Sequence, residues 1–179
     1  MTRPALVLAS TSPQRRAILT QLRIPFEVVA PSFDEQTVDD PLERAAGKAR
    51  SVDGNGRPVL GVDTEVVLDG GLLGKPADGG EAAAMLARLA GRAHEVVSGL
   101  CLRTPDWEEL HTSSTLVTFR ALSDDAIAAY VDSCEWEGRA GAYAIQGLGA
   151  GLVERVDGDY LNVVGLPGAL LLRVLDERF

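Results

Sequence analysis

A short segment near the N-terminus combines hydroxyl and guanidinium groups where the sequence predicts the start of a helix. It reads Ser10-Thr11-Ser12-Pro13-Gln14-Arg15-Arg16 and follows the apolar run Ala5–Ala9. Ser12 fits the N-cap of a helix and Pro13 its first position, where a missing N–H costs nothing. Such a start directs free N–H groups, hydroxyls and guanidiniums at one point, which suits an anion and above all a phosphate. An ordinary capped helix with surface arginines is the alternative.

Three further segments place charged or amide side chains beside apolar runs or glycines. They contain Asp34-Glu35, then Gly61-Val62-Asp63-Thr64 with the later Gly74-Lys75-Pro76, and finally Gln146, and Lys48 lies between the first two carboxylate segments. Carboxylates near lysine and arginine suit metal-assisted phosphate chemistry, because Mg²⁺ or Mn²⁺ is bound by one or two carboxylates together with substrate oxygens. Lysine and arginine then neutralise the remaining phosphate charge.

Most of these residues also have a plainer interpretation. Asp34 and Glu35 could lie in a solvated loop, Lys75 could be a turn residue, and Gln146 could bridge backbone groups. Asp63 differs from them, because a carboxylate between apolar strands is costly to bury unless it is paired or bound to a metal. We therefore take Asp63 as the strongest functional candidate.

Composition and missing motifs exclude several classes of function. The net charge of −9 argues against non-specific binding to nucleic acid, which needs a basic surface. The phosphate-loop pattern G-x-x-x-x-G-K-[ST] is absent, and the glycine-rich stretch Gly138–Gly151 does not have the spacing of a dinucleotide site. His94 and His111 lack metal-ligand spacing and are expected in the core or on the surface. A Ser–His–Asp triad has no supporting elbow motif.

The cysteines and the N-terminal residues indicate in which cellular compartment the protein is expected. Cys101 and Cys134 form no C-x-x-C motif, so we expect reduced thiols in a cytoplasmic protein. Met1–Pro4 leads straight into the first expected strand, without the apolar region of a signal peptide. No apolar run approaches the ~20 residues that a membrane span needs.

Helix and strand patterns alternate and predict an α/β fold with a mixed sheet, because hairpins and crossovers both occur. Strands are expected at Ala5–Ala9, Phe26–Ala30, Pro58–Val62, Glu65–Leu68, Leu72-Leu73, His94–Leu102, Leu110–Phe119, Leu152–Val156 and Tyr160–Val164, the last two as a hairpin over Asp157-Gly158. Helices are expected at Pro13–Arg23, Pro41–Val52, Asp78–Gly91, Ser123–Asp132 and from Pro167 onward.

These segments, in this order, resemble the Maf family of nucleoside triphosphate pyrophosphatases over nearly the whole chain. The resemblance is carried by Leu8–Arg16, Phe33–Glu35, Lys48-Ala49, Gly61–Thr64, Gly74–Pro76, Leu89–Val96, Ala140–Gly149 and Asn162–Pro167. It implies two α/β lobes around a central cleft, as in inosine triphosphate pyrophosphatases, within one domain that spans residues 1–179.

The resemblance also implies a reaction and roles for the residues. The reaction is the metal-dependent hydrolysis of a nucleoside triphosphate to a monophosphate and pyrophosphate, with Mg²⁺ or Mn²⁺ as the expected metal. Asp63 matches the family's proton acceptor, and Glu35 matches a metal- or water-side carboxylate. We expect Asp63 and Glu35 to hold the metal. The phosphate side is matched by Ser10, Arg15, Lys48 and Lys75, together with the helix start at Ser12.

Base choice is linked in this family to the positions of Thr64 and Gln146. This pairing resembles the branch acting on dTTP and UTP, whereas the branch acting on methylated guanosine triphosphate carries Gln and Glu there. Gln14 departs from both branches, which usually have arginine and often have tryptophan, respectively, at its position. We expect dTTP, UTP or a modified pyrimidine nucleotide as substrate, with Gln14 as a third specificity residue.

An alternative function is a nucleotide-sensing regulator of cell division that binds a triphosphate without significant turnover. Asp63 favours the enzyme, because a protein that only binds has no use for an uncompensated carboxylate beside a polyanion. The expected partner is the nucleoside triphosphate, with neither nucleic acid nor membrane. The oligomeric state is left open, with a homodimer as one outcome.

Overall fold

The computed structural model describes residues 3–35 and 38–179. The chain divides into two compact units. The first comprises the residues up to Thr64, Ser98–Ser113 and Gly165–Phe179, and the second comprises Glu65–Val97 and Ser114–Val164. Each unit combines helices with strands, so each is an α/β unit in its own right.

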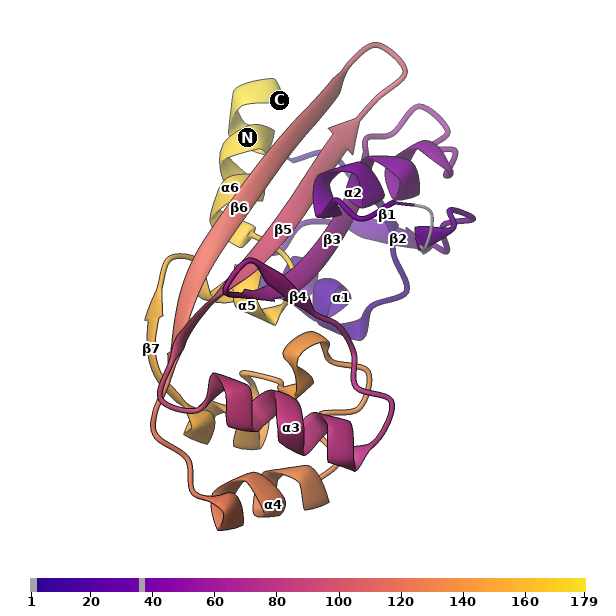
Figure 1. Ribbon diagram of the computed structural model, residues 1–179. Coiled ribbons are helices and arrows are strands. Elements are labelled where there is room, and N and C mark those ends of the chain that lie inside the picture. The colour runs from indigo at the N-terminus through magenta and orange to yellow at the C-terminus, as the bar shows by residue number, and fades with distance from the viewer. Residues whose placement is uncertain (1–2, 36–37) are drawn as a thin grey trace. The chain divides into compact units, whose positions relative to one another are not determined.

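The strands of the described residues form one mixed sheet in the order β2-β1-β3-β5-β6-β7, with β4 paired to β3 (Figure 1). Their bounds are β1 Leu6–Ala9, β2 Phe26–Val29, β3 Val59–Leu68, β4 Gly71–Leu73, β5 Ala93–Arg103, β6 Glu108–Phe119 and β7 Val153–Asp157. β1 runs parallel to β2 and β3, whereas β4 and β7 run antiparallel to their partners. The predicted mixed α/β class is confirmed.

The helices begin largely where the sequence predicts. Their bounds are α1 Pro13–Gln21, α2 Pro41–Arg50, α3 Gly79–Leu89, α4 Asp124–Asp132, α5 Tyr160–Val164 and α6 Gly168–Arg178, with 3₁₀ turns η2 Ala140–Ala142 and η3 Gly147–Leu152. Four N-cap side chains accept a backbone N–H of the first helical turn: Ser12, Asp40, Asp78 and Ser123. Within the described ranges, no helix is long and apolar enough to cross a membrane.

In the first unit, helix α2 approaches strand β3 very closely. A Cβ atom at Gly61 would lie 2.1 Å from the carbonyl oxygen of Ala45, so only glycine permits this distance. Ala45, Ala46 and Ala49 are fully buried on the same side of α2. These small residues bring the helix backbone near the strand, and polar side chains of the helix can therefore reach residues that follow Gly61.

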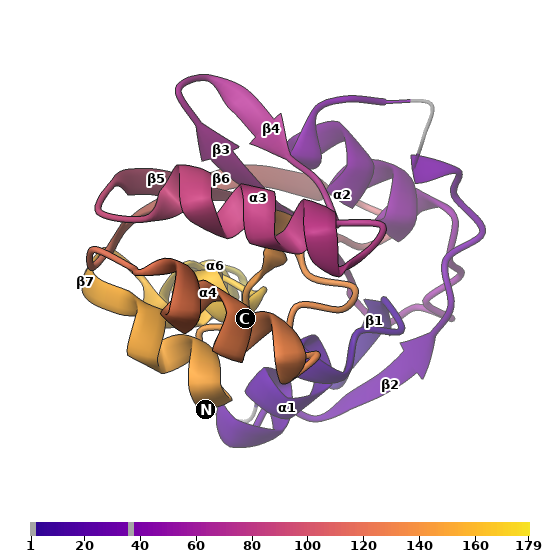
Figure 2. The same cartoon turned by 60° about the horizontal axis from the view of Figure 1, so that its bottom comes forward.

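In the second unit, helices α3 and α4 lie side by side, as both views show (Figures 1 and 2). They cover a core that includes Leu86, Phe119 and Tyr143. His94 is part of this core, because its ring makes edge-on contacts with Phe119 and Tyr143, at centroid distances of 5.1 and 5.4 Å. Of the two locations expected from the sequence, core or surface, His94 takes the core.

Two predicted strands, Pro58–Val62 and Glu65–Leu68, form one continuous strand, β3. The prediction placed Asp63 and Thr64 in a break between them. The strand continues because the Asp63 carboxylate is paired with cations, as described below, so that a charged residue can stay inside a buried strand.

The predicted strand Tyr160–Val164 is wrong, because these residues form helix α5. Asp159 Oδ1 accepts the N–H of Leu161 at 2.8 Å and so favours a helical turn. Asn162 then points inward, where its amide nitrogen donates to the carbonyl oxygen of Val96 at 2.9 Å. The Asp159 cap and the buried hydrogen bond of the Asn162 amide outweigh the apolar, β-branched composition that favoured a strand.

Candidate active site

Asp63 lies inside β3 with only 6% of its surface exposed. Its Oδ1 accepts a hydrogen bond from Lys48 Nζ at 2.6 Å, and its Oδ2 accepts one from Arg44 Nη1 at 3.2 Å. Lys48 and Arg44 are four residues apart on α2 and therefore share one face of the helix. Both cations offset the cost of burying the carboxylate.

Glu35 contacts the same lysine. Its Oε2 lies 3.1 Å from Lys48 Nζ, although its own side chain is half exposed. The loop that carries Glu35 is anchored by Phe33, whose ring lies so close to α2 that a Cβ at Gly47 would come within 2.4 Å of it. The Lys48 ammonium therefore links the two carboxylates that the sequence predicts as metal ligands.

The pair of carboxylates fits a divalent cation. Mg²⁺ and Mn²⁺ use one or two protein carboxylates and take their other ligands from phosphate oxygens and water. In the described part of the chain, no group of three or more His, Cys, Asp or Glu residues could hold a metal ion. An ion bound at Asp63 and Glu35 would therefore take the rest of its coordination from substrate and solvent.

Arg15 joins three distant segments of the first unit. Its Nε donates to the carbonyl oxygen of Gly165 at 2.9 Å, its Nη1 to Ser10 Oγ at 3.1 Å, and its Nη2 lies 3.5 Å from Thr64 Oγ1. Burial lowers the pKa of Arg15 below its usual value, and the negative charge of Asp63 opposes that decrease. The guanidinium remains a cation at neutral pH, because arginine side chains are not deprotonated in proteins.

The remaining polar residues of the first segment gather at the start of α1. Ser12 Oγ caps the helix by accepting the N–H of Arg15 at 3.5 Å and donates to Gln14 Oε1 at 3.1 Å. Ser10 is almost fully buried, and its Oγ accepts the N–H of Ser12 at 3.2 Å. The Ser10 and Ser12 hydroxyls and the Arg15 guanidinium, which form part of the predicted convergence, therefore lie together at this helix start.

The Thr64 hydroxyl is tied into the same network. Its Oγ1 lies 2.8 Å from Ser98 Oγ and 3.3 Å from the carbonyl oxygen of Gly165. Thr64 is thus bonded to fixed groups of β5 and of the segment before α6, and its orientation is set by the first unit itself.

Lys75 and Gln146 belong to the second unit, and both side chains are exposed. Lys75 lies between β4 and α3. The N–H of Gly141 donates to the carbonyl oxygen of Gly74 at 3.0 Å, which places the segment of Lys75 beside η2. η2 leads directly into the loop that carries Gln146. All the other predicted site residues lie in the first unit.

Sequence reasoning missed three groups of this network: the Arg44 guanidinium, the Ser98 hydroxyl and the Gly165 carbonyl. Arg44 could have been found from its helical spacing of four residues from Lys48. Ser98 is a single hydroxyl within an apolar strand and is fully buried, which is a weaker signal. The Gly165 carbonyl is a backbone group and has no side-chain signature.

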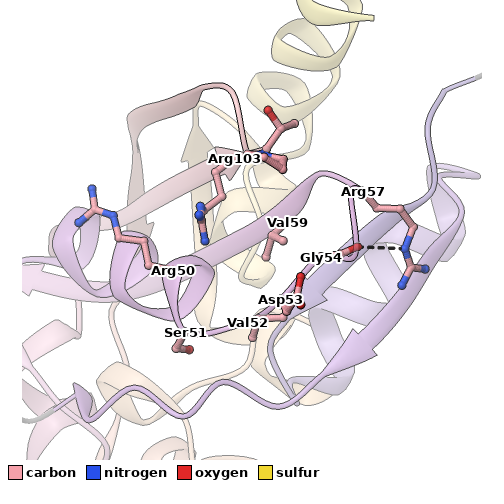
Figure 3. A pocket seen from close by; sticks show the side chains of 11 residues that line it. Arg50, Ser51, Val52, Asp53, Gly54, Arg57, Val59 and Arg103 are labelled. Carbon is pink, nitrogen blue, oxygen red and sulfur yellow. Dashed lines mark hydrogen bonds between the residues drawn. The ribbon is translucent and has the colours of Figure 1, made fainter.

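A separate pocket of about 330 Å³ lies at the C-terminal end of α2 (Figure 3). Three arginines line it, namely Arg50, Arg57 and Arg103. Arg50 and Arg103 are paired with Glu108, and Arg57 Nη2 lies 2.8 Å from Glu27 Oε2. These pairs neutralise much of the positive charge, and none of the predicted site residues is among those that line the pocket. We do not assign the triphosphate to it.

Comparison with known proteins finds relatives that are similar to this chain over most of its length. A relative from Symbiobacterium thermophilum named dTTP/UTP pyrophosphatase is 48% identical over 90% of this chain and 88% of its own length. Relatives of the same name from Deinococcus radiodurans and Bacillus velezensis are 44% and 42% identical, and each match covers more than nine-tenths of both chains. The profile of the family described as "Maf-like protein" matches residues 5–178. The chain therefore belongs to the Maf-like protein family.

Proposed function

We propose that this protein is a dTTP/UTP pyrophosphatase, which hydrolyses a nucleoside triphosphate to a monophosphate and pyrophosphate. The observation that carries the proposal is the contact of Lys48 with both Asp63 and Glu35. Carboxylates that can hold a divalent cation, together with fixed positive charge, suit metal-assisted phosphate hydrolysis. Relatives that bear this activity in their names cover nearly the whole chain.

Asp63 is the proton acceptor in this proposal. Its two oxygens offer roughly four acceptor positions. Lys48 and Arg44 each occupy one of them, so a water molecule can still donate to the carboxylate. The strand and the two cations hold the carboxylate in a fixed orientation, as general base catalysis requires.

The reaction forms a bond between the water oxygen and phosphorus while the bridging P–O bond of the α–β anhydride breaks. The water proton passes to Asp63, and pyrophosphate leaves with the bonding electron pair. A divalent cation held by Asp63 and Glu35 would supply Lewis-acid stabilisation of the phosphate charge. The Arg15 guanidinium and the Lys48 ammonium add fixed positive charge on the protein side.

Substrate capture is assigned to the phosphate-side residues predicted from the sequence: Ser10, Ser12, Arg15, Lys48 and Lys75. Substrate specificity is assigned to Thr64, Gln146 and Gln14. The Thr64 hydroxyl and the Gln146 amide can both donate and accept, as recognition of a uracil or thymine edge requires, whereas Gln14 at the start of α1 is assigned to the phosphate or sugar side. Neutral hydrogen-bonding groups also penalise bases that leave them unpaired.

The proposal includes action in the cytoplasm on a free nucleotide, without nucleic acid or membrane as partner. It treats residues 1–179 as one functional domain, and it leaves the choice between monomer and homodimer to a measurement of mass in solution.

A panel of nucleoside triphosphates, scored for pyrophosphate against orthophosphate, tests the proposal. We expect pyrophosphate from dTTP and UTP, loss of the activity with a chelator, and recovery with Mg²⁺ or Mn²⁺. Orthophosphate as the sole inorganic product would contradict the reaction. Binding of the nucleotide without any product would favour the regulator that senses a triphosphate.

A further inference from the structure

The loop that carries Gln146 is bonded to a carboxylate from the turn after α4. Glu135 Oε1 accepts the N–H of Leu148 at 3.1 Å, and Glu135 Oε2 accepts the N–H of Gly149 at 3.2 Å. Both N–H groups belong to the first turn of η3. Glu135 therefore caps η3 from a position more than ten residues earlier in the chain.

The cap requires a left-handed backbone conformation at the residue after Gln146. Gly147 has a φ of +69°, which L side chains rarely adopt. A Cβ there would lie 2.7 Å from Glu135 Oε1. The carboxylate can approach the loop because this position is glycine, so the loop conformation and the carboxylate fit each other.

A second acceptor holds the other side of the loop. The buried Tyr130 hydroxyl of α4 accepts the N–H of Ala144 at 3.0 Å. Gln146 thus lies between two points at which side chains from α4 and its following turn bind the loop backbone. In the described chain, the Gln146 side chain forms no cap on η3 and is exposed, so its amide is not used to hold the loop.

Glu135 is itself fixed. Its N–H donates to Ser133 Oγ at 3.3 Å, and the indole nitrogen of the next residue, Trp136, donates to the carbonyl oxygen of Val131 at 2.9 Å. A carboxylate on a rigid turn can transmit a defined position to the loop, which a mobile surface carboxylate could not do.

From these contacts we infer that Glu135 is a positioning residue for base choice, acting through Gln146. It fixes the loop backbone by two charge-assisted hydrogen bonds, so that the Gln146 amide meets the base in one orientation. The inference rests on the proposed function, since it needs a nucleotide base for Gln146 to read. It concerns only groups within the second unit.

The first test measures the loop directly. Hydrogen exchange of the Leu148 and Gly149 amides is compared in the wild type, Glu135→Ala and Glu135→Gln. Loss of charge-assisted hydrogen bonds should speed exchange of both amides by about tenfold or more in Glu135→Ala. Glu135→Gln keeps one acceptor oxygen and should give a smaller effect. Unchanged exchange in both variants would overturn the inference. Glu137→Gln is the matched control, because Glu137 is an exposed carboxylate of the same turn.

The second test measures base choice. The ratio of kcat/KM for dTTP to that for dATP should fall by about tenfold in Glu135→Ala, mainly through KM for dTTP, because kcat depends on groups of the first unit. In a Gln146→Ala background the same substitution should change the ratio little, since both act through one contact. Additive effects, or an unchanged ratio despite faster exchange, would contradict the role in base choice.

The two tests separate the inference from the proposed function. If the wild type releases no pyrophosphate from any triphosphate, the proposed function fails and the role in base choice fails with it. The exchange rates of Leu148 and Gly149 would still show whether Glu135 holds the loop.

Discussion

Lys48 Nζ lies 2.6 Å from Asp63 Oδ1, and both side chains are more than 90% buried. A buried charge pair of this kind affects both folding stability and the proposed reaction. Neither partner can be removed without leaving the other charge in a poorly solvated position. The same ammonium also contacts the exposed carboxylate of Glu35. The pair therefore both stabilises the contact of α2 with β3 and holds the side chain of the proposed proton acceptor.

Lys48→Ala should lower the free energy of unfolding by about 3 kcal/mol, because it breaks a buried ion pair. Arg44 remains bonded to Asp63 and limits the loss. Denaturation by urea, followed by circular dichroism, measures this change.

Lys75→Ala is the matched variant, since Lys75 is exposed and its removal should change stability by less than about 0.5 kcal/mol. Both variants should weaken substrate capture. Equal stability of the two variants would show that the Lys48–Asp63 pair contributes little to the fold.

Base choice should follow Gln146 more than Gln14. Gln14 lies at the start of α1, directly before Arg15 in the chain, and its Oε1 accepts a hydrogen bond from Ser12 Oγ. Gln14→Arg adds a positive charge there and should lower KM for all triphosphates by similar factors, because a phosphate contact carries no base information. Gln146→Glu should instead change the order of preference among bases. Steady-state kinetics with dTTP, UTP, dATP and dGTP measure both effects, and the reverse pattern would contradict the assignment.

Acid should destabilise the protein partly through His94. Burial lowers the pKa of His94 to about 4, whereas a histidine in the unfolded chain titrates near 6.5. Above the unfolded value the histidine is neutral in both states. As the pH falls from 6.5 towards 4, only the unfolded chain takes up the proton, so folding stability decreases. The loss should reach about 2 kcal/mol at about pH 5.

Urea unfolding of the wild type and of His94→Gln at about pH 7.5 and about pH 5 isolates this contribution. The carboxylates titrate in both proteins, so the difference between their pH dependences belongs to His94. The variant should lose less stability on acidification than the wild type. Identical pH dependences would show that His94 is not held neutral by the core.

Local signals in the sequence were sufficient for most helix starts and for the cluster of Ser10, Ser12 and Arg15 at the start of α1. Asp40 followed by Pro41 predicts the start of α2, because capping depends only on neighbouring residues. Residues that follow one another along a short motif, such as Ser10, Ser12 and Arg15, also stay together in the fold.

Contacts between distant residues could not be predicted in this way. Arg15 Nε bonds to the carbonyl oxygen of Gly165, 150 residues away, and no spacing rule links the two. Helix α5 was missed because the buried amide of Asn162 finds its partner at Val96 only in the folded chain. Residues 160–164 carry an apolar pattern that suits either a strand or a buried helix, and tertiary bonding decides between them.

The rate of pyrophosphate release from dTTP by Asp63→Asn, measured together with dTTP binding, tests whether Asp63 is the proton acceptor. Asparagine keeps the shape of the side chain but cannot take a proton from water. We expect kcat of Asp63→Asn to fall on the order of 10²–10⁴-fold, because the general base is lost. We also expect the variant to fold, with lower stability because Lys48 and Arg44 lose a charged partner, and to bind dTTP still through Arg15 and the helix start at Ser12. A variant with near-normal turnover would show that Asp63 is not the proton acceptor and has a purely structural role.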